Sequence, residues 1–355
     1  MFKINLTLTL CFLFLSRVEA QTVLSANGEG DTYELINSVL APNYDVVEVP
    51  DCNHDNFGRH IDETFDSELN KNVFRFYIHT NEDDDRCINF DRQRNEIKTY
   101  DKSPNNLLGV ENEKVIYKWK MKLDVNFQPS SSFTHLHQLK SVGGDYSSIP
   151  MYTLTARKGT PDQLELRYTN TDDQSTIKKV DLSLLKGNWV EITEKIAYGS
   201  NTEYSIEIVK ISTGETLFDY SDTSTENWQS GAEFVRPKWG IYRSLNDINS
   251  LRDETVLFAD FSIEEVSTLS TESFIINNLR VKIYPNPTTE SIFIEEKTAN
   301  SYDSILIYDT LGRLIQRNNK AADNTISVSN LNTGTYYFVF KKENEIISKN
   351  SVLID

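Results

Sequence analysis

The chain has 355 residues and a formal net charge of -17 at pH 7, with 53 acidic and 36 basic side chains. An acidic protein lacks the broad basic face that binds phosphate backbones, so this charge argues against a nucleic-acid partner. It does not exclude an acidic polysaccharide, because a local basic cleft can lie on an acidic protein.

The first twenty residues have the pattern of a secretory signal peptide. Lys3 gives a positive start, residues 6–15 are apolar, and Ala20 is a small residue at the expected cleavage point. The apolar run is too short to span a membrane, and no later stretch reaches the required length. We therefore expect residues 1–20 to be removed on export and the mature chain to have no membrane span.

Two cysteines, Cys52 and Cys87, remain in the mature chain after export. In an oxidising compartment an isolated pair of cysteines most often forms one disulfide. We expect a disulfide between them, and the alternative is two free buried thiols. The acidic run Glu82–Asp85 lacks the spaced ligands of a calcium loop, so a solvated acidic turn is the simpler interpretation.

Short segments with strand character dominate residues 21–266. They are rich in β-branched and aromatic residues and are bounded by turn-forming residues, whereas helical spacing of apolar residues occurs in Asp31–Leu40. Besides three polar strands described below, the expected strands are Val73–Ile78, Val115–Leu123, Met151–Ala156, Leu164–Tyr168, Trp189–Ile196, Tyr204–Ile211 and Val256–Ile263. The pattern predicts an all-β fold, a β-jelly roll in which two sheets form a sandwich with a concave cleft.

The C-terminal part of the chain predicts a separate small domain. Residues 267–280 are rich in Ser and Thr at their start and predict a linker. Residues 281–355 alternate strands with turns at Pro285-Asn286-Pro287, Leu311-Gly312-Arg313 and Asn332-Thr333-Gly334, which predicts a small β-sandwich. The order of these motifs resembles the C-terminal sorting domain of type IX secretion cargo in Bacteroidetes. The resemblance implies a secreted or cell-surface protein that the secretion machinery recognises; the alternative is a carbohydrate-binding sandwich.

The first of the three polar strands lies at residues 90–98. Its period of two puts Arg92, Arg94, Glu96 and Lys98 on one face. Two arginines beside a glutamate form a pre-organised binder for a carboxylate, because Arg offers a planar fork that Glu can hold in place. The alternative is a solvent-facing ladder of ion pairs.

The second polar strand, residues 133–140, places His135 and His137 on one face and Gln138 and Lys140 on the other if alternation is strict. Alternation does not say which face is buried, because each face also carries an apolar residue. Two histidines without an evident third ligand do not predict a metal site.

The third polar strand, residues 236–243, directs Trp239 and Ile241 to the core. Lys238, Gly240 and Tyr242 then face outward together, and the glycine is expected to leave room for a ligand backbone. An edge strand with an exposed tyrosine is the alternative.

Together the three strands fit elimination of the 4-linked sugar from a uronic acid. This reaction must neutralise the carboxylate, remove the weakly acidic C5 proton and protonate the leaving oxygen. Arg and Gln can bind the developing dianion. Tyr, His or Lys can transfer the protons if a cationic neighbour adjusts the pKa.

The strands resemble those of β-jelly-roll polysaccharide lyases. Arg94-Asn95-Glu96, Gln138-Leu139-Lys140 and Lys238-Trp239-Gly240-Ile241-Tyr242 are similar, in the same order, to the Arg-Ser-Glu, Gln-Ile-His and Lys-Ala-Gly-x-Tyr strands of alginate lyases. Lys140 replaces a histidine and argues against an ordinary alginate lyase. The stretches Asp91–Pro104, Ser130–Lys140 and Lys238–Leu245 resemble ulvan lyases of polysaccharide lyase family 28 from marine flavobacteria more closely. This implies endolytic cleavage of a sulfated algal polysaccharide beside glucuronic or iduronic acid.

This resemblance suggests a role for each residue. Arg94 and Gln138 are expected to neutralise the uronate, and Tyr242 is the first choice for both proton transfers. Lys140 is expected to lower the tyrosine pKa or to act as the base itself. The expected substrate-binding residues are Arg92, His135, His137, Lys238 and Arg243. No organic cofactor is expected; jelly rolls often hold a structural calcium ion, for which the sequence indicates no ligands.

Other substrates and two other functional classes stay open. The polymer could instead be alginate or glucuronan. A non-catalytic carbohydrate-binding module would keep a basic cleft without needing Tyr242 opposite Lys140. A hydrolase would need two carboxylates facing the cleft, of which Glu96 supplies one.

Overall fold

The computed structural model describes residues 21–266, 281–296, 302–310, 312–320, 324–342 and 345–355. The expected signal peptide and the expected linker lie outside these residues. The chain divides between residues 267 and 268 into two compact units. No helix of the described residues is long and apolar enough to cross a membrane.

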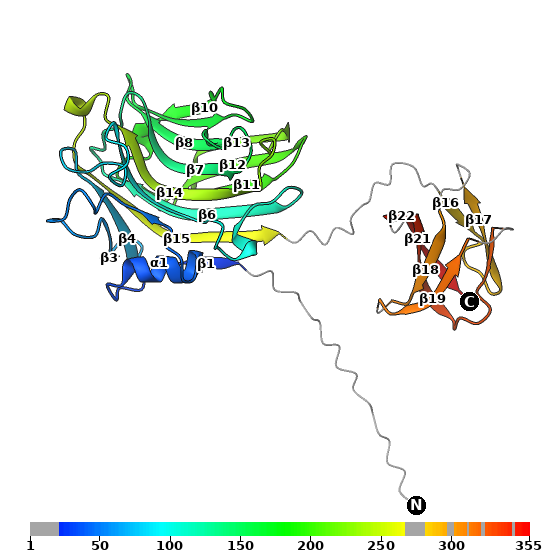
Figure 1. Cartoon of the computed structure of the whole chain (residues 1–355). Helices are drawn as coiled ribbons and strands as arrows, with labels where there is room; N and C mark the ends of the chain where they lie inside the picture. Colours follow the sequence, from blue (N-terminus) through cyan, green and yellow to red (C-terminus); the bar gives the residue numbers. More distant parts are fainter. Residues whose placement is uncertain (1–20, 267–280, 297–301, 311, 321–323, 343–344) are drawn as a thin grey trace, which may run out of the picture. The chain divides into compact units, whose positions relative to one another are not determined.

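The larger unit consists of two antiparallel sheets (Figure 1). The first contains, in spatial order, β13 (Glu215–Thr225), β12 (Thr202–Lys210), β11 (Trp189–Ala197), β6 (Lys114–Leu123), β15 (Glu254–Val266), β4 (Lys71–Ile78) and β3 (Ile61–Asp66), with β1 (Thr22–Leu24) paired to β15. The second contains β10 (Ser175–Asp181), β9 (Gln163–Tyr168), β8 (Tyr152–Arg157), β7 (Thr134–Val142), β14 (Phe234–Ser244), β5 (Arg92–Lys98) and β2 (Val47–Glu48). The helices are α1 (Thr32–Leu40) and three 3-10 turns, Asn105–Leu107, Leu182–Leu184 and Ile248–Ser250.

Each strand segment expected from the sequence is present, and so is the helix. The strands that were not expected include β3, β10 and β13, which are largely polar and mostly exposed or half-buried. Strands at the edge of a sheet need less apolar alternation, because little of their surface reaches a core. Their polar composition is therefore the reason why the sequence pattern did not predict these three strands.

The core lies between the two sheets and is rich in aromatic residues. Trp119 of the first sheet and Trp239 of the second are at most 1% exposed, with ring centroids 6.1 Å apart. Phe261 of β15 lies 5.2 Å from Trp239. Burial of Trp239 and Ile241 confirms the expected orientation of β14. Its other face is therefore available to line a cleft.

The smaller unit is a second sandwich. Its three-stranded sheet is β16 (Val281–Tyr284), β17 (Ser291–Glu296) and β20 (Thr325–Ser327). Its four-stranded sheet is β19 (Leu314–Asn319), β18 (Ser304–Tyr308), β21 (Gly334–Lys342) and β22 (Glu345–Ile354). Ile294, Ile305, Phe338 and Val352 are among the buried side chains of its own core. This confirms the β-sandwich expected for the tail.

Candidate active site

The three polar strands are neighbours in the second sheet, in the order β7, β14, β5. On β14, Tyr242 lies opposite Arg94 and His135, and Lys238 lies opposite Gln138. These side chains line a cleft of about 450 Å³ on the face of the sheet that points away from the core. Segments far apart in the sequence therefore form one polar surface.

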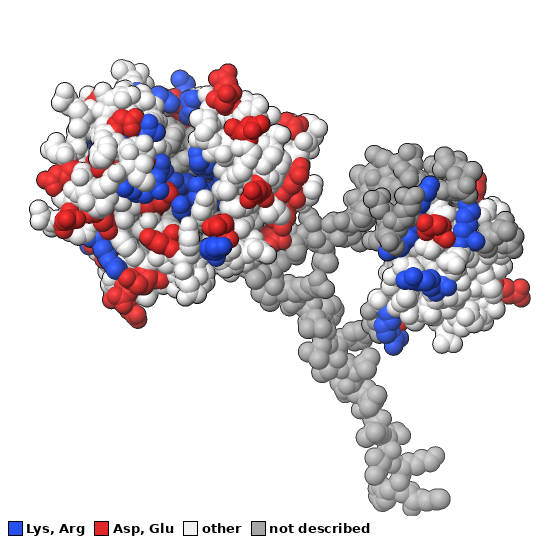
Figure 2. All heavy atoms as spheres, in the orientation of Figure 1, with Lys and Arg blue, Asp and Glu red and all other residues white. Residues whose placement is uncertain are grey.

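The cleft is strongly basic although the protein is acidic. Two carboxylates, Glu48 and Asp172, line it. The cations that line it are Arg86, Arg92, Arg94, Lys140, Arg236 and Lys238. Figure 2 shows such a gathering of Lys and Arg side chains in a hollow of the larger unit. An anionic ligand is therefore the natural occupant.

The two histidines of β7 do not share a face. The register of β7 shifts against β8 between His135 and His137, so an extra residue, Leu136, forms a β-bulge. His135 therefore lines the cleft together with Gln138. His137 is 1% exposed, and its Nε2 lies 2.7 Å from a carboxylate oxygen of Glu194. The expectation that His137 contacts substrate is wrong, because strict alternation fails at a bulge.

Two expectations about β14 are also wrong. Arg243 is fully buried on the other face of the strand, where its Nε donates to Gln93 Oε1 at 2.7 Å and Nη1 donates to the Arg252 carbonyl at 2.8 Å. Arg243 therefore links β14 to Gln93 of β5 and to the Arg252 carbonyl, and it does not reach the cleft. Gly240 has a φ of +146°, and a Cβ there would lie 2.1 Å from the Asn95 carbonyl oxygen. The glycine therefore makes room for strand β5 and not for a ligand.

Arg94 is held rigidly by neighbouring carboxylates. Its Nε and Nη2 donate to Asp85 at 2.8 and 3.3 Å, and Nη1 donates to Glu96. Its guanidinium also lies 3.6 Å above the ring of Tyr242. A guanidinium has five N–H groups, so two remain for a ligand. Gln138 likewise donates one amide hydrogen to Glu96 and keeps the other.

Glu48 gives the site a second carboxylate beside Glu96, a residue that the sequence did not indicate. Lys238 Nζ lies 2.5 Å from Glu48 and 2.7 Å from Glu96. Burial alone would raise the pKa of both carboxyls, but Lys238 and the other nearby cations outweigh it and lower both values. A glycosidase needs one carboxyl that stays protonated near neutral pH. This pair is ionised and therefore does not suit hydrolysis.

Tyr242 is a protonated phenol in its resting state. Burial raises its pKa above the ordinary value of 10.0, and Arg94 and Arg92 oppose that shift only in part. Arg92 Nη1 donates to the phenol oxygen at 3.0 Å. Lys140 lies opposite Arg236, six residues along β14 from Tyr242. The cations that contact the phenol are thus Arg92 and Arg94. The expected influence of Lys140 on the tyrosine pKa stays a prediction.

Lys140 has the properties of a general base. Its pKa is lowered to about 7, first by burial and then by repulsion from Lys238, Arg236 and Arg94. Its Nζ donates to the Ser148 carbonyl at 2.6 Å, and no described carboxylate forms an ion pair with it. A substantial fraction of the amine is therefore neutral at pH 7.

Two further side chains complete the cleft. His135 is neutral, because burial lowers its pKa to about 3, and its Nδ1 lies 2.8 Å from Thr155 Oγ1. Arg236, which the sequence analysis did not assign to the site, lies 4.5 Å above the ring of Tyr100. It forms no ion pair with any described carboxylate and leaves two buried nitrogens without hydrogen-bond partners. Arg236 is therefore available to bind an anion.

A family profile described as "Polysaccharide lyase" matches residues 70–262, more than half of the chain. The chain belongs to the polysaccharide lyase family. A second profile, "Secretion system C-terminal sorting domain", matches residues 282–354. It supports export to the cell surface or the medium. A search of curated proteins finds no match.

Solved structures of other lyases are similar to this one. A family 7 alginate lyase bound to substrate is 14% identical, with a TM-score of 0.42, covering 64% of this chain and 97% of that chain. The endo-β-1,4-glucuronan lyase of the fungus Trichoderma reesei is 12% identical, with a TM-score of 0.43 and coverages of 63% and 91%. A marine alginate lyase from Aplysia kurodai is 11% identical, with a TM-score of 0.48 and coverages of 68% and 98%.

The loops beside the cleft of this lyase confirm one expectation and overturn another. Cys52 and Cys87 form a disulfide, with Cα atoms 6.3 Å apart. The acidic run before Cys87 is not a solvated turn, because Asp83, Asp84 and Asp85 are at most 4% exposed. Asp85 binds Arg94, and the Asp83 carboxylate lies within hydrogen-bond distance of ring nitrogens of three histidines. Buried carboxylates require such partners.

Proposed function

We propose that this lyase cleaves a sulfated, uronate-containing polysaccharide, ulvan, by β-elimination. The observation that carries the proposal is a lysine with a pKa of about 7 in a cleft that also holds a protonated tyrosine. A base works best when its pKa is near the operating pH, and an acid must carry its proton. Lys140 and Tyr242 meet these two requirements.

The uronate carboxylate is assigned to Arg94 and Gln138. Each keeps N–H groups that are not used by Asp85 or Glu96. Those carboxylates fix the two donors before substrate arrives, so little reorganisation is needed when the carboxylate gains charge in the transition state.

The proton transfers then follow from the protonation states. The neutral amine of Lys140 takes the C5 proton and becomes an ammonium. The electron pair of the C5–H bond forms the C4–C5 double bond, and the C4–O4 bond breaks. The Tyr242 hydroxyl donates its proton to O4, and its phenolate is stabilised by Arg92 and Arg94, which both contact it. Tyr242 is thus assigned as the acid. Lys140, and not Tyr242, is assigned as the base.

The excess of cations favours a substrate that carries more than one anionic group per repeat. One carboxylate needs only Arg94 and its neighbours. Arg236 has no described carboxylate partner. Among the described carboxylates, Arg92 pairs only with the exposed Asp91, and it also donates a hydrogen bond to Tyr242. Guanidinium groups bind sulfate-like oxyanions well. The resemblance to ulvan lyases agrees with this argument.

The test compares ulvan, desulfated ulvan, alginate and glucuronan as substrates of the purified full-length chain. Ultraviolet absorbance follows unsaturated uronate, and mass spectrometry follows the product ends. We expect unsaturated products and fastest turnover with ulvan. Products heavier by one water would contradict elimination, and equal rates on alginate would contradict the sulfate preference. Binding without cleavage of any polymer would identify a binding module.

A further inference from the structure

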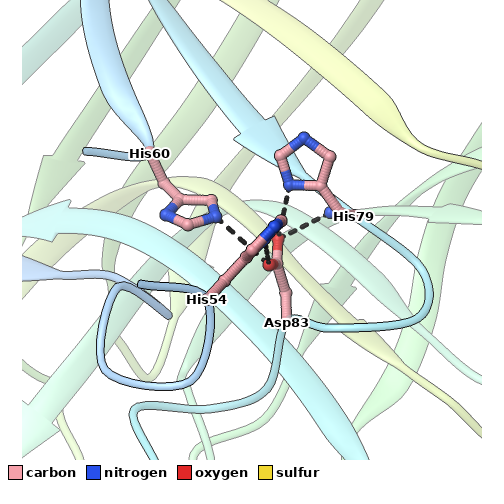
Figure 3. A group of neighbouring side chains, drawn as sticks. All are labelled: His54, His60, His79 and Asp83. Carbon is pink, nitrogen blue, oxygen red and sulfur yellow. Dashed lines mark hydrogen bonds and ion pairs between the residues drawn. The ribbon is translucent and has the colours of Figure 1, made fainter. Parts of the chain in front are cut away.

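Three histidines converge on one buried carboxylate outside the cleft (Figure 3). His54 and His60 lie in the loop between β2 and β3, whereas His79 and Asp83 lie in the loop that follows β4. One ligand atom from each residue lies within 4.8 Å of all the others. His60 and the Asp83 carboxylate are fully buried, and His54 is 12% exposed.

The ring nitrogens that point inward lie close to the Asp83 carboxylate. His54 Nδ1 and His60 Nε2 lie 2.9 and 3.1 Å from Asp83 Oδ1, and His79 Nδ1 lies 3.2 Å from Oδ2. In a tetrahedral site with bonds of about 2.1 Å, the ligand atoms are about 3.4 Å apart. The three nitrogen–oxygen distances are somewhat shorter than this value, and all four ligand atoms lie within 4.8 Å of one another, so the cluster is compact enough to surround one ion.

The nitrogens that point outward are held by further carboxylates. His60 Nδ1 lies 2.7 Å from Asp51, and His54 Nε2 lies 2.7 Å from Glu82. A histidine that binds a metal usually donates its other N–H to a carboxylate, which fixes the tautomer and the ring orientation. Two of the three histidines have this arrangement. Phe57 packs on the rings, with centroids 4.3 Å from His79 and 4.8 Å from His60.

We propose that His54, His60, His79 and Asp83 bind a structural zinc ion. Three imidazoles and one carboxylate are ligands that Zn²⁺ accepts, and four protein ligands leave no open position for catalysis. The competing explanation is a hydrogen-bonded network without metal. In that network both His54 and His60 must carry two N–H groups, because a carboxylate faces each of their four ring nitrogens.

The ion would stabilise the strand that carries Arg94. The Gln93 amide donates to the carbonyls of His79 and Asp83, and the Asn95 amide donates to that of His60. These residues alternate along β5 with Arg94. Two residues after Asp83, Asp85 binds the Arg94 guanidinium from the cleft side. The proposed site is thus connected to the cleft through one strand and one short loop.

The test measures metal content and affinity in the purified full-length chain. We expect about one zinc per chain by mass spectrometry of the elements, and a lower Tm after treatment with a strong chelator that ZnCl₂ reverses. Titration of the metal-free protein with Co²⁺ should give the intense visible absorption of a tetrahedral site. A wild-type protein that binds neither ion, or whose Tm does not respond to either, would overturn the proposal.

Variants separate zinc binding from folding. Glu82→Gln changes an exposed carboxylate that contacts only the outer nitrogen of His54, so the fold should persist while zinc affinity falls about 10- to 100-fold. His79→Gln should lose the site more completely. The matched control is His135→Gln, which removes a histidine of the cleft and should leave one zinc per chain. Equal zinc affinity in Glu82→Gln, His79→Gln and the control would overturn the proposal.

Discussion

The cleft and the histidine cluster lie on opposite faces of strand β5, and they are built in opposite ways. In the cleft, cations outnumber the carboxylates that line it, and Arg236 and Lys140 have no described carboxylate partner. In the cluster, three ring nitrogens point at one carboxylate, and further carboxylates lie behind two of the rings.

The difference indicates what each site binds. Cations spread along three strands, with N–H groups left over, attract an extended anion. Nitrogens that converge on one point, with acceptors behind them, suit a single small cation. The first substitutions below change the cleft and should leave the histidine cluster unaffected, and the last changes a core residue outside both sites.

The largest effect is expected at the two groups assigned to proton transfer. Lys140→Met removes the amine and keeps an apolar stem, whereas Tyr242→Phe removes only the hydroxyl. Each should lower kcat about 10²-fold or more, with little change in substrate binding. Steady-state kinetics on ulvan with binding measured separately would check this. If Tyr242→Phe kept near-normal turnover while Lys140→Met was inactive, the tyrosine would not be the acid.

A smaller effect is expected at Arg236, a cation without a described carboxylate partner. Arg236→Gln should raise KM about 10- to 100-fold, because a charge-assisted hydrogen bond contributes about 1.5–3 kcal/mol. The matched control is Arg75→Gln, whose guanidinium pairs with Asp62 on the other sheet. Desulfated ulvan provides the second comparison. If Arg236 binds sulfate, the variant and the wild type should have similar KM values on that substrate.

Below neutral pH, kcat/KM should rise about tenfold for each pH unit. A base must be unprotonated, and the pKa of Lys140 is lowered from 10.5 to about 7. Activity, as kcat/KM, should therefore rise with pH up to about 7 and then level off. Arg236→Gln removes one cation that lowers this pKa, so the rising limb should move to higher pH. If the Tyr242 phenolate were the base, kcat/KM would still rise above pH 10, because burial raises that pKa.

The sequence predicted the cleft well because alternation survives on two of its three strands. Arg92, Arg94, Lys238 and Tyr242 all reach the cleft as their period of two requires. The pattern failed at Leu136, because a bulge adds one residue without leaving a signal in residue type. Glu48 was missed because its strand has only two residues.

The histidine cluster was missed for a different reason. Its four ligands lie in loops, where neither period of two nor helical spacing applies, and they spread over 30 residues from His54 to Asp83. A signal was nevertheless present in the composition. Of the five histidines in the chain, three fall between residues 54 and 79, and both cysteines of the disulfide flank the same two loops.

His137 belongs to neither site and gives the smallest expected effect on function. It lies in the core, where Glu194 accepts from its Nε2 at 2.7 Å and from the Tyr204 hydroxyl at 2.8 Å. His137→Leu leaves Glu194 buried with one partner, which should lower the free energy of unfolding by about 3 kcal/mol. Turnover per folded molecule and zinc content should both stay unchanged.

Two comparisons make the His137 prediction specific. In the double variant with Glu194→Leu, the buried carboxylate is gone, so the double variant should be less destabilised than His137→Leu alone. Chemical denaturation of the wild type, the two single variants and the double variant measures this difference directly. His135→Gln, one residue before the bulge, should instead alter kinetics on ulvan with little loss of stability. If His137→Leu abolished turnover in protein that is still folded, His137 would belong to the cleft and would compete with Lys140 for the role of base.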